Sequence, residues 1–349
     1  MDQIKGAQSI MFREAPYLIS AASVAGSKEA DGPIGKLFDV TDKDDLFGAQ
    51  TWEEAESNMQ KEACVLAAGK AHVDLKKIRY LFGGDLLRQG IATSMGVEAL
   101  QIPMFGLYGA CSTSGEALAL ASMSAAAGYG GTMLAVTSSH FGSAEKEFRF
   151  PLGYANQRPL SSHWTVTGSG AFLVRSAEEY QKNQMQPYFS HIRITGVTVG
   201  KIVDYGLKDS QNMGACMAPA AASTLERHFI DFNSQPEDYD KIITGDLGKV
   251  GQKVLFDLMK EKNFDISEQH MDCGMEIFDE ATQDTHAGGS GCGCSAVTLS
   301  AYILKQLEEH NWKKVLFMPT GALLSKTSFN EGKSVPGIAH ALVLESPVL

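Results

Sequence analysis

Short apolar runs alternate with longer stretches of helical period along this chain. The runs at 78–82, 133–139 and 239–243 have the length of buried strands. Residues 52–72 place apolar side chains at helical spacing and carry glutamates near their start, which predicts an amphipathic helix. Strands that alternate with helices are typical of largely parallel, buried sheets, so the pattern predicts an α/β fold.

Two further stretches, 112–128 and 295–309, are small or apolar on most faces. A helix of this kind is buried all round, and its small residues let it lie close between two sheets. We therefore expect a five-layer α-β-α-β-α arrangement. The stretch 218–232 predicts an outer helix that begins near Pro219, because proline is favoured in a first turn.

The chain also resembles itself. An apolar strand that ends in Gly-Asp-Leu at 84–86 has a counterpart that ends in Gly-Asp-Leu at 245–247. A Cys-Ser pair opens an apolar helix at Cys111 and another at Cys294, and a strand follows each helix. These matches, in the same order, predict a duplication into two pseudo-symmetric halves. The predicted halves are residues 1–180 and 181–349.

Composition narrows the class of protein. The net charge of −11 argues against a nucleic-acid partner and against electrostatic adsorption to an anionic membrane. No apolar run reaches the roughly 18 to 20 residues of a spanning helix, and the first residues lack the features of a signal peptide. The six cysteines show no disulfide framework, and Cys292-Gly-Cys294 is too tight for an isolated zinc site. We expect a cytosolic-type protein with reduced cysteines.

Cys111 is the leading candidate for chemistry. It lies at a predicted helix start, where backbone N–H groups and the helix dipole favour a thiolate. The alternative is a small buried core residue. The carboxyl end of its strand should bring Asp85 to the same face as Cys111, either as a turn residue or as a ligand contact. Its twin Asp246 presents the same choice in the other half. His140 and Arg88 could bind a carboxylate there, or could be a helix-adjacent histidine and a surface charge.

Three segments together resemble the thiolase superfamily, and in particular its β-ketoacyl synthases. They are Gly109-Ala-Cys-Ser-Thr-Ser-Gly115, Gly168-Ser-Gly-Ala171 and Thr320-Gly-Ala322. The resemblance implies a thiolase-like fold whose cysteine carries an acyl group with help from a histidine and an asparagine. Where the family has that histidine, this chain reads Thr244-Gly-Asp-Leu-Gly248, and the asparagine loop reads Ala287-Gly-Gly-Ser-Gly-Cys-Gly-Cys294.

We therefore expect that the condensation chemistry is lost and that Cys111 is a relic nucleophile, because the cysteine, the histidine and the asparagine of the family act as a unit. The alternative is an acyl-CoA or acyl-carrier condensing enzyme in which His286 or His140 assists Cys111. By analogy with thiolase-fold proteins, we expect a homodimer.

A second set of sequence segments gives a more specific family resemblance. It comprises Gly84-Asp-Leu-Leu87, Thr137-Ser-Ser-His140, Thr165-Val-Thr-Gly-Ser-Gly170, Met217-Ala-Pro-Ala-Ala-Ala222 and Gly288-Gly-Ser-Gly-Cys292. Together with the cysteine segment, these strings resemble the stage V sporulation protein AD family of spore-forming bacteria. The resemblance implies binding of dipicolinic acid (pyridine-2,6-dicarboxylic acid), for uptake into the developing spore and release at germination. It also implies membrane-spanning partners in a spore channel complex and peripheral association with the spore inner membrane.

The charge of that ligand raises a physical question. Dipicolinate is a dianion at neutral pH, whereas the predicted site holds Asp85 and Cys111 in an acidic protein. Either helix N-termini supply a positive field, or the bound species is the neutral calcium chelate. We expect no resident cofactor. Calcium would enter with the ligand, with Asp85 as its candidate contact.

Overall fold

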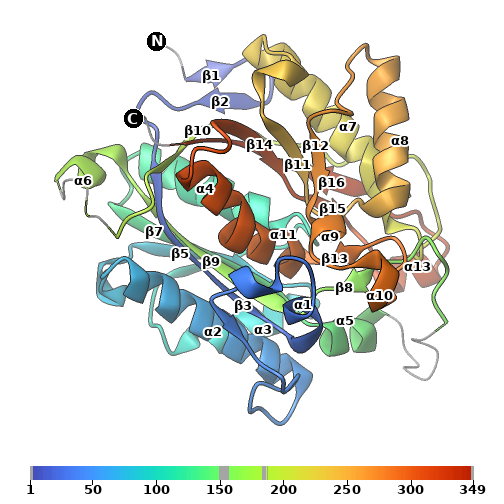
Figure 1. Cartoon of the computed structure of the whole chain (residues 1–349), viewed down its shortest axis with the longest axis horizontal. Helices are drawn as coiled ribbons and strands as arrows, with labels where there is room; N and C mark the ends of the chain where they lie inside the picture. Colours follow the sequence, from blue (N-terminus) through green and yellow to red (C-terminus); the bar gives the residue numbers. More distant parts are fainter. Residues whose placement is uncertain (1–2, 149–156, 183–185, 187, 347–349) are drawn as a thin grey trace.

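A continuous hydrogen-bonded sheet runs through both halves of the chain in the computed structural model (Figure 1). The structure describes residues 3–148, 157–182, 186 and 188–346. In spatial order the main strands are β12 (His270–Asp272), β11 (Lys241–Thr244), β14 (Lys314–Met318), β17 (Ala341–Glu345), β10 (Ile192–Thr198), β3 (Tyr17–Ala25), β9 (Gly168–Arg175), β7 (Thr132–Ser139), β5 (Tyr80–Gly84) and β6 (Met104–Gly106).

The sheet consists of two groups of strands with the same order and directions. In the first group, the first strand β3 pairs antiparallel with the last strand β9, and β9 pairs antiparallel with the fourth strand β7. In the second group, β10, β17 and β14 pair in the same way. The fourth strand β7 then pairs parallel with β5, and β5 pairs parallel with β6. The equivalent strands β14, β11 and β12 of the second group are also parallel. The sheets are thus mixed rather than largely parallel, because the closing strand of each half returns between the first and fourth strands. The groups meet where β3 and β10 pair, at Leu18 with Ile192 and Tyr17 with Arg193.

Helices form three layers around these strands (Figure 1). The helices α2 (Trp52–Lys70) and α3 (Ile91–Glu98) pack on the first group, and α7 (Met213–Phe232) and α8 (Gly248–Glu261) pack on the second. Between the groups lie α4 (Thr113–Ala126) and a second helix, which runs through α11 (Cys292–Thr298), the π-helix η6 (Leu299–Ile303) and α12 (Leu304–Glu308). The five-layer thiolase-like α/β fold is confirmed.

One predicted helix start is wrong. Helix α7 begins at Met213, where the Asn212 side chain accepts a hydrogen bond from the backbone N–H of Ala215 (3.3 Å). Pro219 therefore lies inside the helix rather than in its first turn, and it is buried there. A cap residue determined this helix start more strongly than the proline did.

Shorter elements complete the described chain. The small strands are β1 (Ile4–Lys5), β2 (Ser9–Met11), β4 (Val40–Thr41), β8 (Trp164–Thr165), β13 (Gly289–Ser290), β15 (Thr320–Ala322) and β16 (Gly337–Ala339). The short α-helices are α1 (Ser27–Ala30), α5 (Phe141–Phe148), α6 (Ala177–Lys182), α9 (Cys273–Glu276), α10 (Glu280–Gln283) and α13 (Lys326–Asn330). The 3-10 turns are η1 (Gly35–Leu37), η2 (Leu75–Lys77), η3 (Arg88–Gly90) and η5 (Pro236–Asp238).

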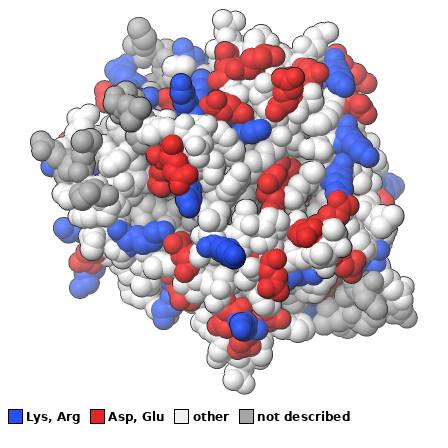
Figure 2. Space-filling view, viewed as in Figure 1, with Lys and Arg blue, Asp and Glu red and all other residues white. Residues whose placement is uncertain are grey.

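The predicted boundary between residues 180 and 181 falls within α6 and stays a prediction. Among the helices that the structure describes, none combines the length and the apolar character needed to cross a membrane. Acidic and basic side chains are interspersed over the face seen in Figure 2.

Candidate functional site

Cys111 lies in a sharp turn between β6 and α4. Ala110, just before it, has a left-handed backbone conformation (φ 50°), which turns the chain abruptly into the helix. The Thr113 side chain holds this turn, because its Oγ1 donates to the carbonyl of Ala110 (2.6 Å) and accepts from the backbone N–H of Gly109 (3.0 Å). The Cys111 thiol is almost buried, with 6% of the residue exposed.

Asp246, after β11, lies beside this thiol. Its carboxylate accepts hydrogen bonds from Thr320 Oγ1 (2.8 Å), from the backbone N–H of Gly291 (3.1 Å) and from the Cys111 thiol. The aspartate is buried. Cys111 comes from the first half of the chain and its partners come from the second. The structure therefore brings two of the predicted site residues, Cys111 and Asp246, into contact across the halves.

The surroundings of Cys111 keep its thiol protonated. Burial, and after it the charge of Asp246, raise the pKa of Cys111 well above its ordinary value. Of the two alternatives for Cys111, this environment favours the buried core thiol over the stabilised thiolate, because desolvation and a neighbouring carboxylate oppose the effect of the helix N-terminus. Burial also raises the pKa of Asp246 to about 7.

A second thiol, that of Cys292, was not among the predicted site residues. Its Sγ donates to the carbonyl of Ser138 (2.8 Å), and it packs in one apolar cluster with Cys111, Leu86 and Ala144. In the internal repeat Cys294, not Cys292, corresponds to Cys111, so the duplication gave no hint of this neighbour. The position of Cys292 directly after the glycine-rich loop was the sequence feature that could have indicated its proximity to Cys111.

A cavity of about 430 Å³ lies near these thiols, although neither Cys111 nor Cys292 is among its lining residues. Leu86 lines it and belongs to the apolar cluster that contains both cysteines, and Phe148 lines it and packs against that cluster. Arg88 also lines it, and its Nε forms an ion pair with Glu147 Oε1 (2.5 Å) while more than half of its side chain stays exposed. The rest of the cavity wall is largely apolar, and Lys326 is its second cation. Further lining residues are Tyr108, Leu323, Leu324 and Lys326.

Asp85 has a different environment from its twin. Its Oδ1 accepts from the backbone N–H of Leu87 (2.8 Å), and its Oδ2 accepts from the backbone N–H and the Oγ1 of Thr93 (2.8 and 2.6 Å). Both oxygens are thus engaged by the turn after β5 and by α3. This geometry favours the turn role of Asp85 over contact with a ligand or with calcium.

His140 does not reach the cavity beside Cys111. Its Nδ1 accepts from the backbone N–H of Gly142 (3.0 Å), so its Nε2 carries the proton and donates to the carbonyl of Asp45 (2.7 Å). Burial lowers the pKa of His140, which keeps the ring neutral. The ring lines another cavity, of about 330 Å³, with Trp52 and Trp164. The sequence placed His140 correctly after β7, but it did not give the direction of the side chain.

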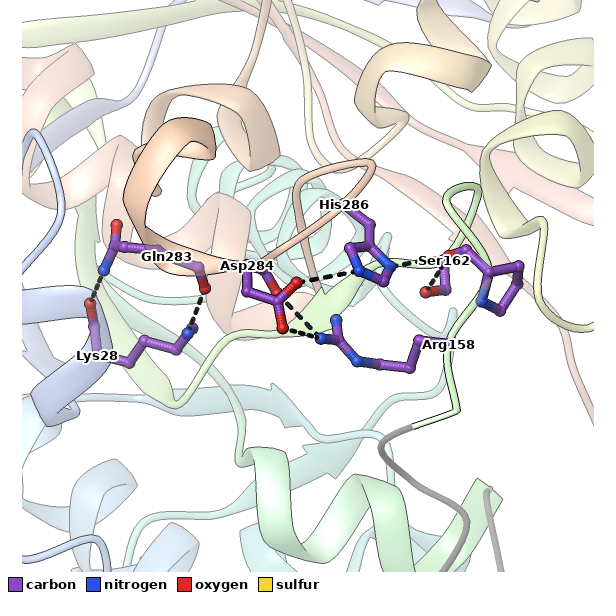
Figure 3. Close-up of polar contacts among 7 residues, drawn as sticks. Lys28, Arg158, Ser162, Gln283, Asp284 and His286 are labelled. Atoms are coloured by element: carbon purple, nitrogen blue, oxygen red, sulfur yellow. Dashed lines mark hydrogen bonds and ion pairs between the residues drawn. The ribbon is translucent and has the colours of Figure 1, made fainter.

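His286 belongs to a network that ties the glycine-rich loop to the first half (Figure 3). Its Nδ1 donates to the carbonyl of Pro159 (2.9 Å), and its Nε2 pairs with Asp284 Oδ1 (3.0 Å). Arg158 Nη2 donates to both the carboxylate and the carbonyl of Asp284 (3.0 Å each). The His286 ring is therefore engaged by Pro159 and Asp284, and this geometry does not favour the predicted alternative in which His286 assists Cys111.

The same network includes a reciprocal link between α1 and α10 (Figure 3). Lys28 Nζ donates to the carbonyl of Gln283 (2.5 Å), and Gln283 Nε2 donates to the carbonyl of Lys28 (2.6 Å). The loop that follows has left-handed residues at Asp284, His286 and Gly291. Its shape directs the Gly291 N–H toward Asp246. Within the described part of the chain, no group of three or more His, Cys, Asp or Glu side chains is arranged to hold a metal ion.

Comparisons with known proteins agree with this fold. A family model described as "Stage V sporulation protein AD" matches residues 6–345. The Bacillus subtilis stage V sporulation protein AD is 40% identical over 343 residues, which cover 98% of both chains. Among solved structures, human mitochondrial 3-ketoacyl-CoA thiolase aligns with a TM-score of 0.57 at 11% identity, covering 96% of this chain and 99% of its own. The 3-oxoacyl-[acyl-carrier-protein] synthase III of Aquifex aeolicus aligns with a TM-score of 0.56 at 12% identity, covering 95% of this chain and 99% of its own. At these identities the two enzymes show the fold alone.

Proposed function

Because the chain belongs to the stage V sporulation protein AD family, we propose that it binds dipicolinic acid in the cavity beside Cys111. The observation that carries this proposal is the lining of the cavity. Leu86, Phe148 and Leu324 offer apolar surface to a planar ring, and Arg88 and Lys326 offer positive charge to its carboxylates. Dipicolinate is a planar ring that carries two carboxylates, so its chemistry matches this lining.

The charge of the lining also bears on the bound species. Arg88 and Lys326 outnumber Glu147 in the lining, so its charge is net positive and suits the free dicarboxylate better than the neutral calcium chelate, and Asp85, the candidate calcium contact, is engaged elsewhere. We propose that the protein serves uptake of the compound into the developing spore and its release at germination. In this proposal it acts beside membrane-spanning proteins of a channel complex, at the spore inner membrane.

We further propose that the protein does not catalyse condensation. The Cys111 thiol is held protonated, and His140 and His286 make their hydrogen bonds elsewhere. The alternative, a condensing enzyme that acts on acyl-CoA or acyl-carrier substrates, is favoured by one observation. Cys111 keeps the sharp turn at the start of a central helix, with Cys292 as a second thiol beside it.

Calorimetric titration of the full chain with dipicolinate, with and without calcium, tests the proposal. Pyridine-3,5-dicarboxylate serves as the control, because it has the same ring, charge and carboxylate spacing but does not place its carboxylates on either side of the ring nitrogen. We expect saturable binding of the 2,6-isomer and much weaker binding of the 3,5-isomer. Equal binding of the two isomers, or no binding, would contradict the proposal. Covalent acyl transfer from acyl-CoA to Cys111, measured by mass spectrometry, would favour the enzyme instead.

The edge strand β6 supports a homodimer as part of this proposal. All of its residues are exposed, including Met104 and Phe105, and it lies at the end of the sheet. An exposed apolar edge strand is a template for pairing with a second copy. Sedimentation of the protein and of Phe105→Lys tests this, with a dimer expected for the first and a monomer for the second.

A further inference from the structure

The cavity that His140 lines is separate from the proposed dipicolinate site and differs from it in chemistry. It has a volume of about 330 Å³, and three aromatic residues, Trp52, Phe141 and Trp164, form part of its wall. All of its lining residues belong to the first half of the chain, and none of them lines the cavity at Leu86. A small cavity with an apolar body and a few polar groups has the usual form of a ligand site.

The indole ring of Trp52, at the start of α2, lies close against the backbone of α5 at Gly142. A Cβ atom at Gly142 would lie 2.5 Å from Trp52 Cδ2, so the ring can lie this close because Gly142 has no side chain. Among the residues that the structure describes, no ring stacking and no cation–π contact involves Trp52, whereas Trp164 is stacked on Phe141. Trp52 therefore lines the cavity with a ring that no other ring or cation covers.

The ring of Trp164 already attracts positive charge. Lys28 Nζ lies 4.3 Å from its centroid, and the guanidinium carbon of Arg158 lies 4.9 Å from it. Both distances are within the range of about 6 Å over which a cation is attracted to an aromatic ring. Lys28 Nζ also donates to the carbonyl of Gln283 (2.5 Å), so this ammonium is held at the wall of the cavity (Figure 3).

Carboxyl groups outnumber ammonium groups in the lining. Glu29, Asp45 and Glu145 line the cavity, against one lysine, Lys28. Glu29 is buried, with 1% of the residue exposed, and its Oε1 accepts from the backbone N–H of Thr167 (2.9 Å). Burial raises the pKa of Glu29 to about 7, so a cation bound beside it would hold it in the ionised form. The lining therefore favours a positively charged ligand and disfavours a dianion.

We propose that this cavity is a second ligand site, which binds a small organic cation that consists of an ammonium group on an apolar or aromatic body. The ammonium group pairs with the Glu29 carboxylate, and the apolar body packs on Trp52. Aromatic rings together with a carboxylate are the chemistry that recognises ammonium ligands. The two cavities then select opposite charges. Because they share no lining residue, this inference does not rest on the proposed function.

Intrinsic fluorescence measures this binding, because two of the three tryptophans of the chain, Trp52 and Trp164, line the cavity. The full chain is titrated at pH 8 with benzylammonium, benzyl alcohol and benzoate, which share a ring and differ in charge. We expect a saturable change with benzylammonium, about tenfold weaker binding of benzyl alcohol, and still weaker binding of benzoate. No saturable change with benzylammonium, or binding of either other probe with equal or higher affinity, would overturn the proposal.

Glu29→Gln separates the charge of this residue from its packing. Glutamine keeps an acceptor for the Thr167 N–H and removes the charge, so the affinity for benzylammonium should fall about tenfold while that for benzyl alcohol stays unchanged. Glu56→Gln is the matched control, because Glu56 is also buried but accepts from Ser138 Oγ and Ser143 Oγ and does not line the cavity. Equal losses in the two variants would overturn the assignment to Glu29.

Two substitutions at Trp52 test the aromatic part of the site. Trp52→Phe keeps a ring and should weaken benzylammonium binding at most about threefold, whereas Trp52→Leu should weaken it about tenfold. Trp164 still reports on the cavity in both variants. Wild-type affinity in Trp52→Leu would overturn the role of the ring. The three-probe series on the wild-type chain needs no variant, so it tests the proposal even if a substituted chain does not fold.

Discussion

Asp85 and Asp246 occupy the same place in the two halves of this protein and do different things. Each follows a glycine at the end of an equivalent strand, β5 or β11, and precedes a leucine. Asp85 uses both oxygens on the amides of its own turn and of α3. Asp246 points away from its turn, toward Gly291 and Thr320.

The second half holds its turn with another carboxylate. Asp272 accepts from the backbone N–H groups of Leu247 (2.9 Å) and Gly248 (3.1 Å), and from Thr244 Oγ1 (2.6 Å). Because Asp272 satisfies these amides, the Asp246 side chain is free to contact Cys111. A repeated motif therefore preserves a backbone turn, whereas the role of its side chain depends on what else satisfies that turn.

The largest expected effect is on stability, at Asp85. Asp85→Ala removes the acceptor of two buried backbone N–H groups, and we expect a loss of about 3 kcal/mol in the free energy of unfolding, because each unpaired buried donor is costly. Urea unfolding measures this, with Asp246→Asn as the comparison variant and a smaller expected loss. If Asp85→Ala kept wild-type stability and lost dipicolinate binding, the division of roles between the two aspartates would be wrong.

A pH profile of stability sharpens the comparison within the first half. In that half burial raises the pKa of Glu56 to about 8 and that of Glu29 to about 7, and it also raises the pKa of Asp85. A raised carboxyl pKa gives stability that is complete below the unfolded pKa and declines as pH rises toward 8, by up to about 1.4 kcal/mol per pH unit. Thermal unfolding of Glu56→Gln between pH 5 and pH 8 should show a flatter profile than the wild type. An unchanged profile would mean that another group carries the proton.

Affinity should depend on Cys111 and not on its repeat twin. Cys111→Ala removes a side chain that packs with Leu86 at the wall of the cavity, and we expect dipicolinate binding to weaken about tenfold, or about 1.4 kcal/mol. Cys294→Ala is the matched control, since its Sγ donates to the carbonyl of Gly245 (3.5 Å) within the core. Equal losses in both variants would point to packing rather than ligand contact.

The smallest expected effect is at Arg88, on the exposed side of the cavity. Arg88→Ala should weaken binding about threefold, because an exposed ion pair is screened and already shared with Glu147. The loss should shrink further at high salt. Calorimetry at two ionic strengths checks this, and a salt-independent loss would indicate a buried contact with the ligand.

Periodicity and repetition made most of the fold predictable. The amphipathic helix α2 and the two central helices follow from local patterns, and the duplicated strands follow from matching segments. The turn at Cys111 was likewise visible in its glycines and hydroxyl residues. Cys292 and Thr320 were not recognised, because their proximity to Cys111 arises only when the halves pack together.

The two histidines show a second limit of the sequence. His140 and His286 lie close along the chain to residues of the site, but backbone partners fix both rings elsewhere. The Gly142 amide and the Pro159 carbonyl decide these orientations. Neither contact follows from residue type or spacing, since a side chain's direction depends on its rotamer and on which acceptor lies within reach.

The narrow pairing of β3 with β10 has a mechanical consequence. The strands join at two positions, Leu18 with Ile192 and Tyr17 with Arg193, so this seam alone resists sliding of one half past the other only weakly. Away from this seam, the cavity is lined by residues of both halves, with Leu86 and Phe148 from the first and Leu324 from the second. A molecule that fills this cavity would contact both halves, so we expect binding to restrict their movement relative to each other.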